Sequence, residues 1–442
     1  MIKKQTPVDS EVVKEKIDGS GLRDLGLASI REIVKLVNQI ERATGIRYIR
    51  MEMGVPGLLP PSIGIEAEIE ALKNGVASTY PNIEGLRSLK EETSRFVKLF
   101  LNVDVQSKGC IPTVGSMMGG MISFLVANRN DHTKEGTLFI DPGFPVQKQQ
   151  AKMLGHSYYS FDVYDYRGSK LKDKLESYLV GGKISSILYS NPNNPSWICF
   201  TEEELKTIGD LAIKYDVIVI EDLAYLGMDF RKDYSKPGQP PFQPTIAHYI
   251  DDYVLLISCS KIFSYAGQRI GMMVISDHLF EREYPDLLRY YTSDKFGHSA
   301  IFGALYGLSG GVPSSAQYGL AALFKAVNDG TYKYLDDVKE YGEKAKKMKD
   351  LFTKNGFRIV YNTDIDVPLA DGFYFTVSYP GLTGKELLEE LLYYGISAIS
   401  LDITGSSRHE GLRACVSKVP VDQFGVLEER LKKFNEDHPL DN

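Results

Sequence analysis

The sequence predicts an α/β protein with a large domain, built on a mostly parallel sheet of seven-stranded type flanked by helices. The first observation is a series of short runs rich in β-branched and aromatic residues, at positions 137–141, 184–189, 217–221, 254–258 and 272–275. The second is that segments of helical periodicity separate these runs. Strands that alternate with helices indicate a parallel sheet covered on both faces.

The C-terminal third indicates a smaller α+β domain. Residues 321–356 are charged and have helical periodicity. Strand-like runs follow at 357–361, 373–378 and 411–416, around a helix near 385–394. A length of 442 residues is enough for two domains with substantial cores. We expect a large domain at 60–325 and a small domain formed by both termini, residues 1–59 and 326–442.

A helix is predicted directly after Ser29, where apolar residues recur at Ile30, Ile33, Val34, Val37 and Ile40. Ser29 and Glu32 have the spacing of a capping box, and Gly45 is a typical helix stop.

The charge distribution argues against nucleic-acid and membrane partners. There are 58 acidic and 51 basic residues, a formal net charge of -7, and no basic stripe. Two stretches lack Asp, Glu, Lys and Arg, residues 109–128 and 296–324, but Pro112 and Pro313 interrupt them. We interpret both as buried segments.

The cysteines favour a reducing compartment. The four residues Cys110, Cys199, Cys259 and Cys415 are far apart and have neither CxxC nor Cys/His spacing, so we expect neither zinc nor a disulfide framework. Since the N-terminal residues lack the apolar core of a signal peptide, the expected location is cytoplasmic.

The most informative segment is 258–271, SCSKIFSYAGQRIG, which follows an apolar strand. A lysine taken alone is usually a solvated surface residue. Here Lys261 stands at the end of a predicted strand, where desolvation lowers the pKa of an amine and lets it attack an aldehyde. Upstream, Asp222 in VIEDLAY (219–225) ends another predicted strand, at the edge where open α/β sheets bind ligands. Capping of the next helix is the alternative role for Asp222.

Segment 258–271 resembles the active-site signature of class I/II aminotransferases, enzymes of fold type I that use pyridoxal 5'-phosphate. The resemblance implies that Lys261 holds this cofactor as a Schiff base, and that Ser258 and Arg269 bind its phosphate, for which the planar fork of arginine is suited. It also implies that Asp222 pairs with the pyridine nitrogen and that Tyr225 donates to the phenolic oxygen of the ring.

Three other turns resemble cofactor-binding turns of the family. The segment PTVGSMMGG (112–120) matches the phosphate-binding turn at a helix N-terminus, which implies roles for Gly115, Ser116 and Met117. In DPGFP (141–145), Phe144 would stack on the pyridine ring. In YPNIEG (80–85), Tyr80 would reach the phosphate of a neighbouring subunit, which implies a homodimer with shared active sites.

The remaining matches concern the substrate. In SNPNNP (190–195), Asn194 would contact the phenolic oxygen of the cofactor and the substrate; the motif then departs from the family, with Ser196 for threonine and Trp197 for glycine. Gly54 in MGVP (53–56) would lie against the substrate carboxylate, and Arg413 in EGLRACV (410–416) would bind that carboxylate bidentately.

The matches occur in the family's order from Gly54 to Arg413, and they imply transfer of an amino group from an L-amino acid to a 2-oxo acid by a ping-pong mechanism. Lys261 would be the general base and then the acid, and closure of the small domain would accompany substrate binding. A β-lyase or related carbon-sulfur lyase or decarboxylase on the same fold is the alternative.

Other classes of function have less support. A cofactor-sensing regulator would need an attached DNA-binding module, which the sequence does not indicate. A catalytically inactive relative is disfavoured because all the expected polar groups are present. A dicarboxylate substrate would need a second cation, for which Lys295, Arg289 and Arg408 are candidates, while aromatic and aliphatic substrates stay open.

Overall fold

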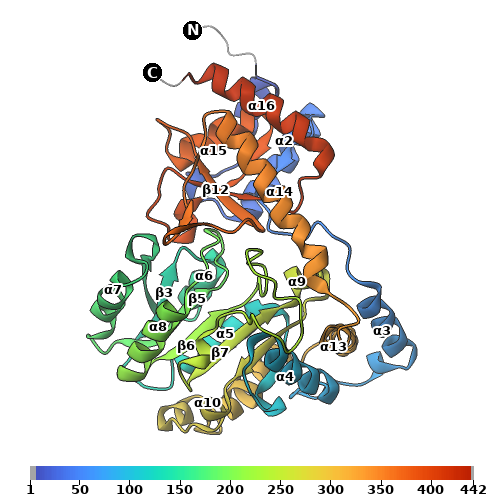
Figure 1. Ribbon diagram of the computed structural model, residues 1–442, viewed down its shortest axis with the longest axis vertical. Helices are drawn as coiled ribbons and strands as arrows, with labels where there is room; N and C mark the ends of the chain where they lie inside the picture. The colour runs from blue at the N-terminus through green and yellow to red at the C-terminus, as the bar shows by residue number, and fades with distance from the viewer. Residues whose placement is uncertain (1–5, 440–442) are drawn as a thin grey trace. The chain divides into compact units, whose positions relative to one another are not determined.

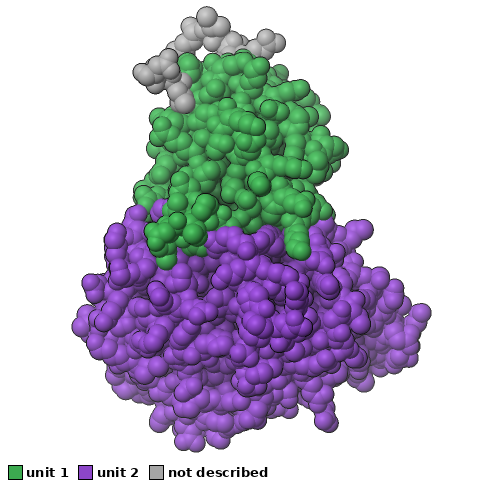
Figure 2. Space-filling view, viewed as in Figure 1, with its two compact units in different colours: residues 1–57, 194–198, 339–442 green, residues 58–193, 199–338 purple. Residues whose placement is uncertain are grey.

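The computed structural model describes residues 6–439, which form two compact units. Unit 1 contains Met1–Gly57, Asn194–Ile198 and Lys339–Asn442, and unit 2 contains Leu58–Asn193 and Cys199–Val338 (Figure 2). The domains expected at 60–325 and at 1–59 with 326–442 stay a prediction, because compact packing alone does not show that a unit folds independently.

Unit 2 contains a seven-stranded sheet with the strand order β2-β8-β7-β6-β5-β3-β4. All neighbouring pairs from β7 to β4 are parallel, and β8 is antiparallel to both β7 and β2. The strands are β2 (Cys110–Thr113), β3 (Gly136–Asp141), β4 (Ser157–Asp162), β5 (Ile184–Ser190), β6 (Ile218–Asp222), β7 (Tyr253–Ser258) and β8 (Gly271–Ile275). The predicted mostly parallel sheet is therefore confirmed, and all five predicted strand runs fall on strands.

The helices of unit 2 flank this sheet (Figure 1). They are α3 (Ser62–Lys73), α4 (Arg87–Leu101), α5 (Gly115–Ala127), α6 (Pro145–Met153), α7 (Lys170–Leu179), α8 (Glu202–Lys214), α9 (Cys259–Ile262), α10 (Asp277–Glu281), α11 (Phe296–His298), α12 (Tyr306–Ser309) and α13 (Ser314–Asn328). Every residue of the central strands β5, β6, β7 and β8 is buried. Burial on both faces explains why β7 and β8 are almost entirely apolar rather than alternating between apolar and polar residues.

Unit 1 contains an antiparallel four-stranded sheet, β14-β15-β12-β9, and a parallel pair, β1 with β13. Its strands are β1 (Ile49–Arg50), β9 (Arg358–Ile359), β10 (Thr363–Asp364), β11 (Val367–Pro368), β12 (Tyr374–Ser378), β13 (Ile396–Ser397), β14 (Ile399–Ser400) and β15 (Leu412–Cys415). Its helices are α1 (Ser10–Asp18), α2 (Ile30–Thr44), α15 (Gly384–Tyr393) and α16 (Phe424–Asp437), and the long helix α14 (Tyr334–Lys354) begins in unit 2 and ends in unit 1.

The predicted helix signals are confirmed. Helix α2 has the reciprocal capping box of Ser29 and Glu32, and it ends at Gly45, whose φ of 71° is left-handed. Thr201 and Glu204 form the same kind of box at the start of α8. No helix within residues 6–439 is long and apolar enough to cross a membrane.

Candidate functional site

The polar residues predicted in unit 2 gather at one edge of its sheet. Ser190 of β5 is in register with Asp222 of β6, and Ser258 of β7 is in register with Gly271 of β8. Because parallel strands end together, their carboxyl ends lie side by side at this edge, with the amino end of the antiparallel strand β8. Lys261 follows at once, on the short helix α9, where it is half-buried between the buried residues Ser260 and Ile262.

A cradle for an anion lies at the N-terminus of helix α5. Gly115, the first residue of α5, has a φ of +70°, and a Cβ on it would lie 2.5 Å from Nη2 of Arg269. Only glycine therefore allows the guanidinium to approach the first turn of the helix, where the amides of Ser116 and Met117 have no carbonyl partner within the helix. An exposed guanidinium beside a helix N-terminus suits a phosphate group.

Asp222 is a buried carboxylate without an ion-pair partner among the described residues. Its Oδ2 accepts a hydrogen bond of 2.8 Å from Nε2 of Gln147, and its Oδ1 accepts one of 3.1 Å from the amide of Ala224. Burial raises the pKa of Asp222 from 3.8 to about 6, against these two hydrogen bonds. A cationic nitrogen beside this carboxylate would supply the missing counter-charge.

Helix α6 supplies two residues to the same region. Phe144 is the N-cap residue of α6 and is half-buried, and Gln147 lies in the first turn of the helix. Gln147 could not be predicted from the sequence, because a single glutamine in the first turn of a helix matches no motif. Tyr225 is buried in the turn after β6, where its carbonyl accepts a hydrogen bond of 3.0 Å from the amide of Met228.

Glu221, a second buried acid, organises the turns at this edge and was likewise not predicted. It accepts hydrogen bonds from the hydroxyl of Thr245, from the amide of Ile246 at 3.1 Å and from Nδ2 of Asn191 at 3.4 Å. Asn191 in turn accepts, at its carbonyl, a bond of 3.1 Å from Nε2 of Gln243. These bonds join the turn after β5 to residues 243–246.

Glu221→Gln is expected to stabilise the protein at alkaline pH. Burial raises the pKa of Glu221 from 4.5 to about 7, so the folded state binds more protons than the unfolded state between these values, and stability falls as the pH rises through them. Because glutamine does not titrate, the variant does not lose stability in this pH range. Its unfolding free energy relative to the original protein should therefore rise by roughly 3 kcal/mol from pH 4.5 to pH 8. Thermal unfolding at both pH values measures the change, and an unchanged difference between the two proteins would contradict it.

Unit 1 contains a separate cluster around Arg413, which lies on β15. Nη2 of Arg413 donates to the carbonyl of Glu52 at 2.7 Å, Nη1 donates to Oδ1 of Asn194 at 3.4 Å, and the guanidinium lies 4.6 Å from the ring centroid of Tyr374. A Cβ on Gly54 would lie 1.9 Å from the hydroxyl of Tyr374, so only glycine fits there. Three predicted substrate residues, Gly54, Asn194 and Arg413, are thus brought together.

Arg413 is 1% exposed, and no ion pair is found for it among the described residues. Its Nε is buried and has no hydrogen-bond partner in the described part of the chain. Buried charges in proteins are normally paired, because removing a charge from water is costly. An unpaired guanidinium of this kind is therefore a candidate site for a carboxylate ligand.

Trp197, which stands where the resemblance to the family places a glycine, has a left-handed backbone conformation. Trp197 has a φ of 65°, the left-handed conformation that glycine adopts readily. Its ring is accommodated because Gly372 lacks a Cβ, which would lie 1.9 Å from the indole, and the indole packs edge-on to Tyr374 with centroids 6.3 Å apart. Trp197 therefore supports the ring that stacks on Arg413.

The structure places the other candidates as follows. Tyr80 is 98% exposed in unit 2. Lys295 forms an ion pair with Glu281 at 2.9 Å and Arg289 one with Asp286 at 3.3 Å, so both cations already have acidic partners. Arg408 lies in unit 1 and is half-buried.

Comparisons with known proteins identify the family of this chain. The sequence profile described as aminotransferase class I and II matches residues 48–431, so the chain belongs to this family of pyridoxal phosphate-dependent aminotransferases. A probable aspartate aminotransferase of Methanocaldococcus jannaschii is 25% identical over 75% of this chain and 88% of its own length. A putative aminotransferase of Bacillus subtilis, YugH, is 23% identical over 89% of this chain and 92% of its own length.

The fold is that of solved aminotransferases. The aspartate aminotransferase of Thermus thermophilus superposes with a TM-score of 0.74 at 14% identity, covering 96% of this chain and 98% of that one. The alanine aminotransferase of Pyrococcus furiosus superposes with a TM-score of 0.73 at 20% identity, covering 92% and 97%. At these identities the superpositions show the fold alone.

Proposed function

We propose that this chain transfers an amino group from an L-amino acid to a 2-oxo acid by a ping-pong mechanism, with pyridoxal 5'-phosphate as its cofactor. The observation that carries the proposal is the convergence of Lys261, Asp222 and the anion cradle of Arg269 and α5 at one sheet edge. The cofactor matches this set: its phosphate suits the cradle, and its ring nitrogen suits the unpaired carboxylate of Asp222.

Each residue has a role that follows from its chemistry. Bound pyridoxal phosphate would supply an aldehyde carbon and a ring that withdraws electrons from the substrate. Nζ of Lys261 would hold the cofactor and, once released, would take a proton from the substrate Cα as general base and donate it as general acid to the former aldehyde carbon of the cofactor. Asp222 would keep a proton on the ring nitrogen of the bound cofactor. Arg413 binds the substrate carboxylate and fixes the orientation of the Cα–H bond.

Three residue groups complete the proposed cofactor site. Ser258, Ser116, Met117 and Arg269 bind the phosphate, Tyr225 and Asn194 bind the phenolic oxygen, and Phe144 stacks on the ring. We also propose that the protein is a cytoplasmic homodimer in which Tyr80 reaches the phosphate of the partner's site. An aromatic side chain that is 98% exposed supports burial against a second subunit, as do Leu59 at 90% and Tyr306 at 64%.

The test is the visible absorption spectrum of the protein with pyridoxal phosphate, before and after single amino acids are added without any 2-oxo acid. Conversion of the cofactor band to that of its amine form, with release of a 2-oxo acid, is the expected result and ranks the amino-group donors. Release of ammonia, sulfide or carbon dioxide instead would assign the chain to the lyase or decarboxylase alternative.

Arg413→Ala is expected to raise KM for the amino acid while the cofactor spectrum stays unchanged. Losing one partner of a buried, hydrogen-bonded charge pair costs about 2–4 kcal/mol, which corresponds to a KM roughly 30- to 1,000-fold higher. Arg413→Lys should recover only part of the loss, because an ammonium does not form the bidentate pair. Arg289→Ala removes an exposed arginine and is the matched control. Normal saturation of Arg413→Ala would show that another cation binds the carboxylate.

A further inference from the structure

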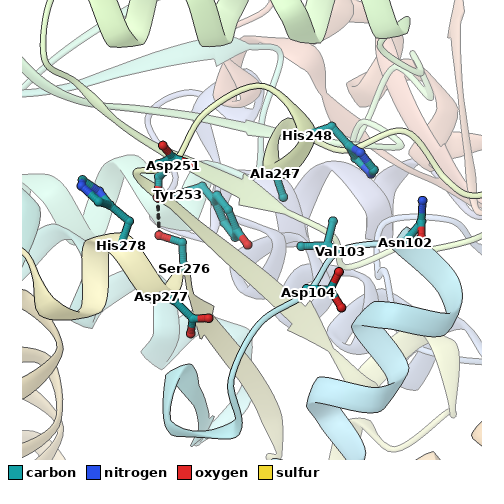
Figure 3. Close-up of a pocket in the computed structure, with 10 residues that line it drawn as sticks. All are labelled: Asn102, Val103, Asp104, Ala247, His248, Asp251, Tyr253, Ser276, Asp277 and His278. Atoms are coloured by element: carbon teal, nitrogen blue, oxygen red, sulfur yellow. Dashed lines mark hydrogen bonds between the residues drawn. The ribbon is translucent and has the colours of Figure 1, made fainter.

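A pocket lies in unit 2 at the amino end of β7, the opposite end of that strand from Ser258 (Figure 3). Its volume is about 430 Å³. Its lining comes from the residues that follow α4, from the turn before β7 and from the start of α10: Asn102, Val103, Asp104, Ala247, His248, Asp251, Tyr253, Ser276, Asp277 and His278. None of these residues belongs to the proposed cofactor or substrate sites.

The pocket is acidic. Asp104, Asp251 and Asp277 line it, and neither lysine nor arginine is among the described residues that do. Asp104 forms an ion pair of 2.8 Å with Lys98. Asp277 accepts a hydrogen bond of 3.0 Å from the amide of Gln106. The Asp251 carboxylate has no ion-pair or hydrogen-bond partner among residues 6–439, which the structure describes.

The other titratable groups do not neutralise the pocket. Nε2 of His248 lies 2.8 Å from the carbonyl of Leu101, and Nδ1 of His278 lies 2.9 Å from Asp252, which also binds Arg282. Both rings are thus already hydrogen-bonded.

Tyr253 gives an independent indication of a ligand. Its side chain is 4% exposed, and its hydroxyl has no hydrogen-bond partner in the described part of the chain. Figure 3 shows the hydroxyl directed into the pocket, on the side where Val103 and Asp104 lie. Burial, followed by the charges of Asp277, Asp251 and Asp104, raises the pKa of Tyr253, so the hydroxyl stays protonated. The hydroxyl is not one of the fully buried unpaired atoms, so it lies at the wall of the open pocket, where it can hydrogen-bond to a ligand.

We propose that this pocket binds a small organic cation with two amino groups, a short aliphatic diamine. A single metal ion would need ligands that converge on one point. Among the described residues, only Asp131, His132 and Asp286 form a group of three or more acidic, histidine or cysteine residues whose ligand atoms lie within 4.8 Å of one another. The three aspartates of the pocket do not form such a group. Separated carboxylates suit two ammonium groups joined by a chain, and the volume falls within the range of small-molecule sites.

Titration calorimetry of the full-length protein, loaded with pyridoxal phosphate that has been reduced onto Lys261 with borohydride so that it no longer reacts with amines, against 1,4-diaminobutane at low ionic strength tests the proposal. We expect saturable binding of one diamine per chain that weakens as salt is added. Butylamine, with one amino group, and Mg²⁺ should each bind at least about tenfold more weakly, because neither can engage the separated carboxylates together.

Two variants connect the binding to this pocket. Tyr253→Phe removes only the hydroxyl and should weaken diamine binding about 3- to 10-fold, and Asp251→Asn should weaken it about tenfold or more. Glu91→Gln changes an exposed acid of α4 outside the pocket and should leave binding unchanged. The proposal is wrong if no saturable binding occurs, if both pocket variants bind as the original protein does, or if Mg²⁺ or butylamine binds equally well. Because no catalytic residue is altered, aminotransferase activity is a separate readout.

Discussion

Lys261→Ala is expected to abolish the covalent bond to pyridoxal phosphate and to lower kcat by at least about 10⁴-fold, since both covalent catalysis and the general base are lost. The phosphate cradle of Arg269 and α5 stays intact in this variant, so the cofactor should still bind, without the visible band of its lysine adduct. Absorption spectroscopy and single-turnover assays measure the two effects independently.

Lys206→Ala is the matched control for that experiment. Lys206 is exposed on α8 and pairs with Asp210 at 2.6 Å, so its removal should change neither the spectrum nor the rate. An unchanged spectrum in Lys261→Ala would show that another lysine holds the cofactor, and the assignment of the whole sheet edge would then fail.

The residues at the sheet edge could be predicted because their positions follow from local sequence. A polar residue that ends a β-branched run, as Asp222 and Ser258 do, marks the carboxyl end of a strand, and parallel strands place these ends together. Gly115 was predicted from the character of its turn. Glycine is required at position 115 because Arg269, 154 positions later in the chain, approaches it closely. Only the structure shows this contact.

Other features could not be predicted because they depend on long-range packing. The antiparallel strand β8 lies between β2 and β7, an order that no local pattern specifies. Residues 194–198 belong to unit 1 because Trp197 packs on Gly372 and Tyr374, far along the chain. Gln243 lies in a segment rich in proline that contains neither a helix nor a strand, yet it is buried and donates a hydrogen bond to the carbonyl of Asn191.

Asp222→Asn is expected to lower kcat roughly 100- to 1,000-fold, the usual effect of losing a preorganised charge that stabilises the transition state. The same change should stabilise the cofactor-free protein at pH 8. Folding raises the pKa of Asp222 from 3.8 to about 6. The stability that Asp222 contributes is therefore fully present below pH 3.8 and is lost as the pH rises through 6. The gain in the variant at pH 8 is about 3 kcal/mol.

A loss of kcat together with a gain in stability distinguishes a carboxylate that acts on the cofactor from one that only supports the fold. Glu221→Gln, one residue away on β6, should give a similar gain in stability at pH 8 without loss of kcat, because alternation along a strand directs neighbouring side chains to opposite faces. Adding pyridoxal phosphate should raise the melting temperature of the original protein more than that of Asp222→Asn, since a cationic ring nitrogen offsets the buried charge. If both variants lose activity equally, Asp222 supports the fold of the turn and does not act on the cofactor.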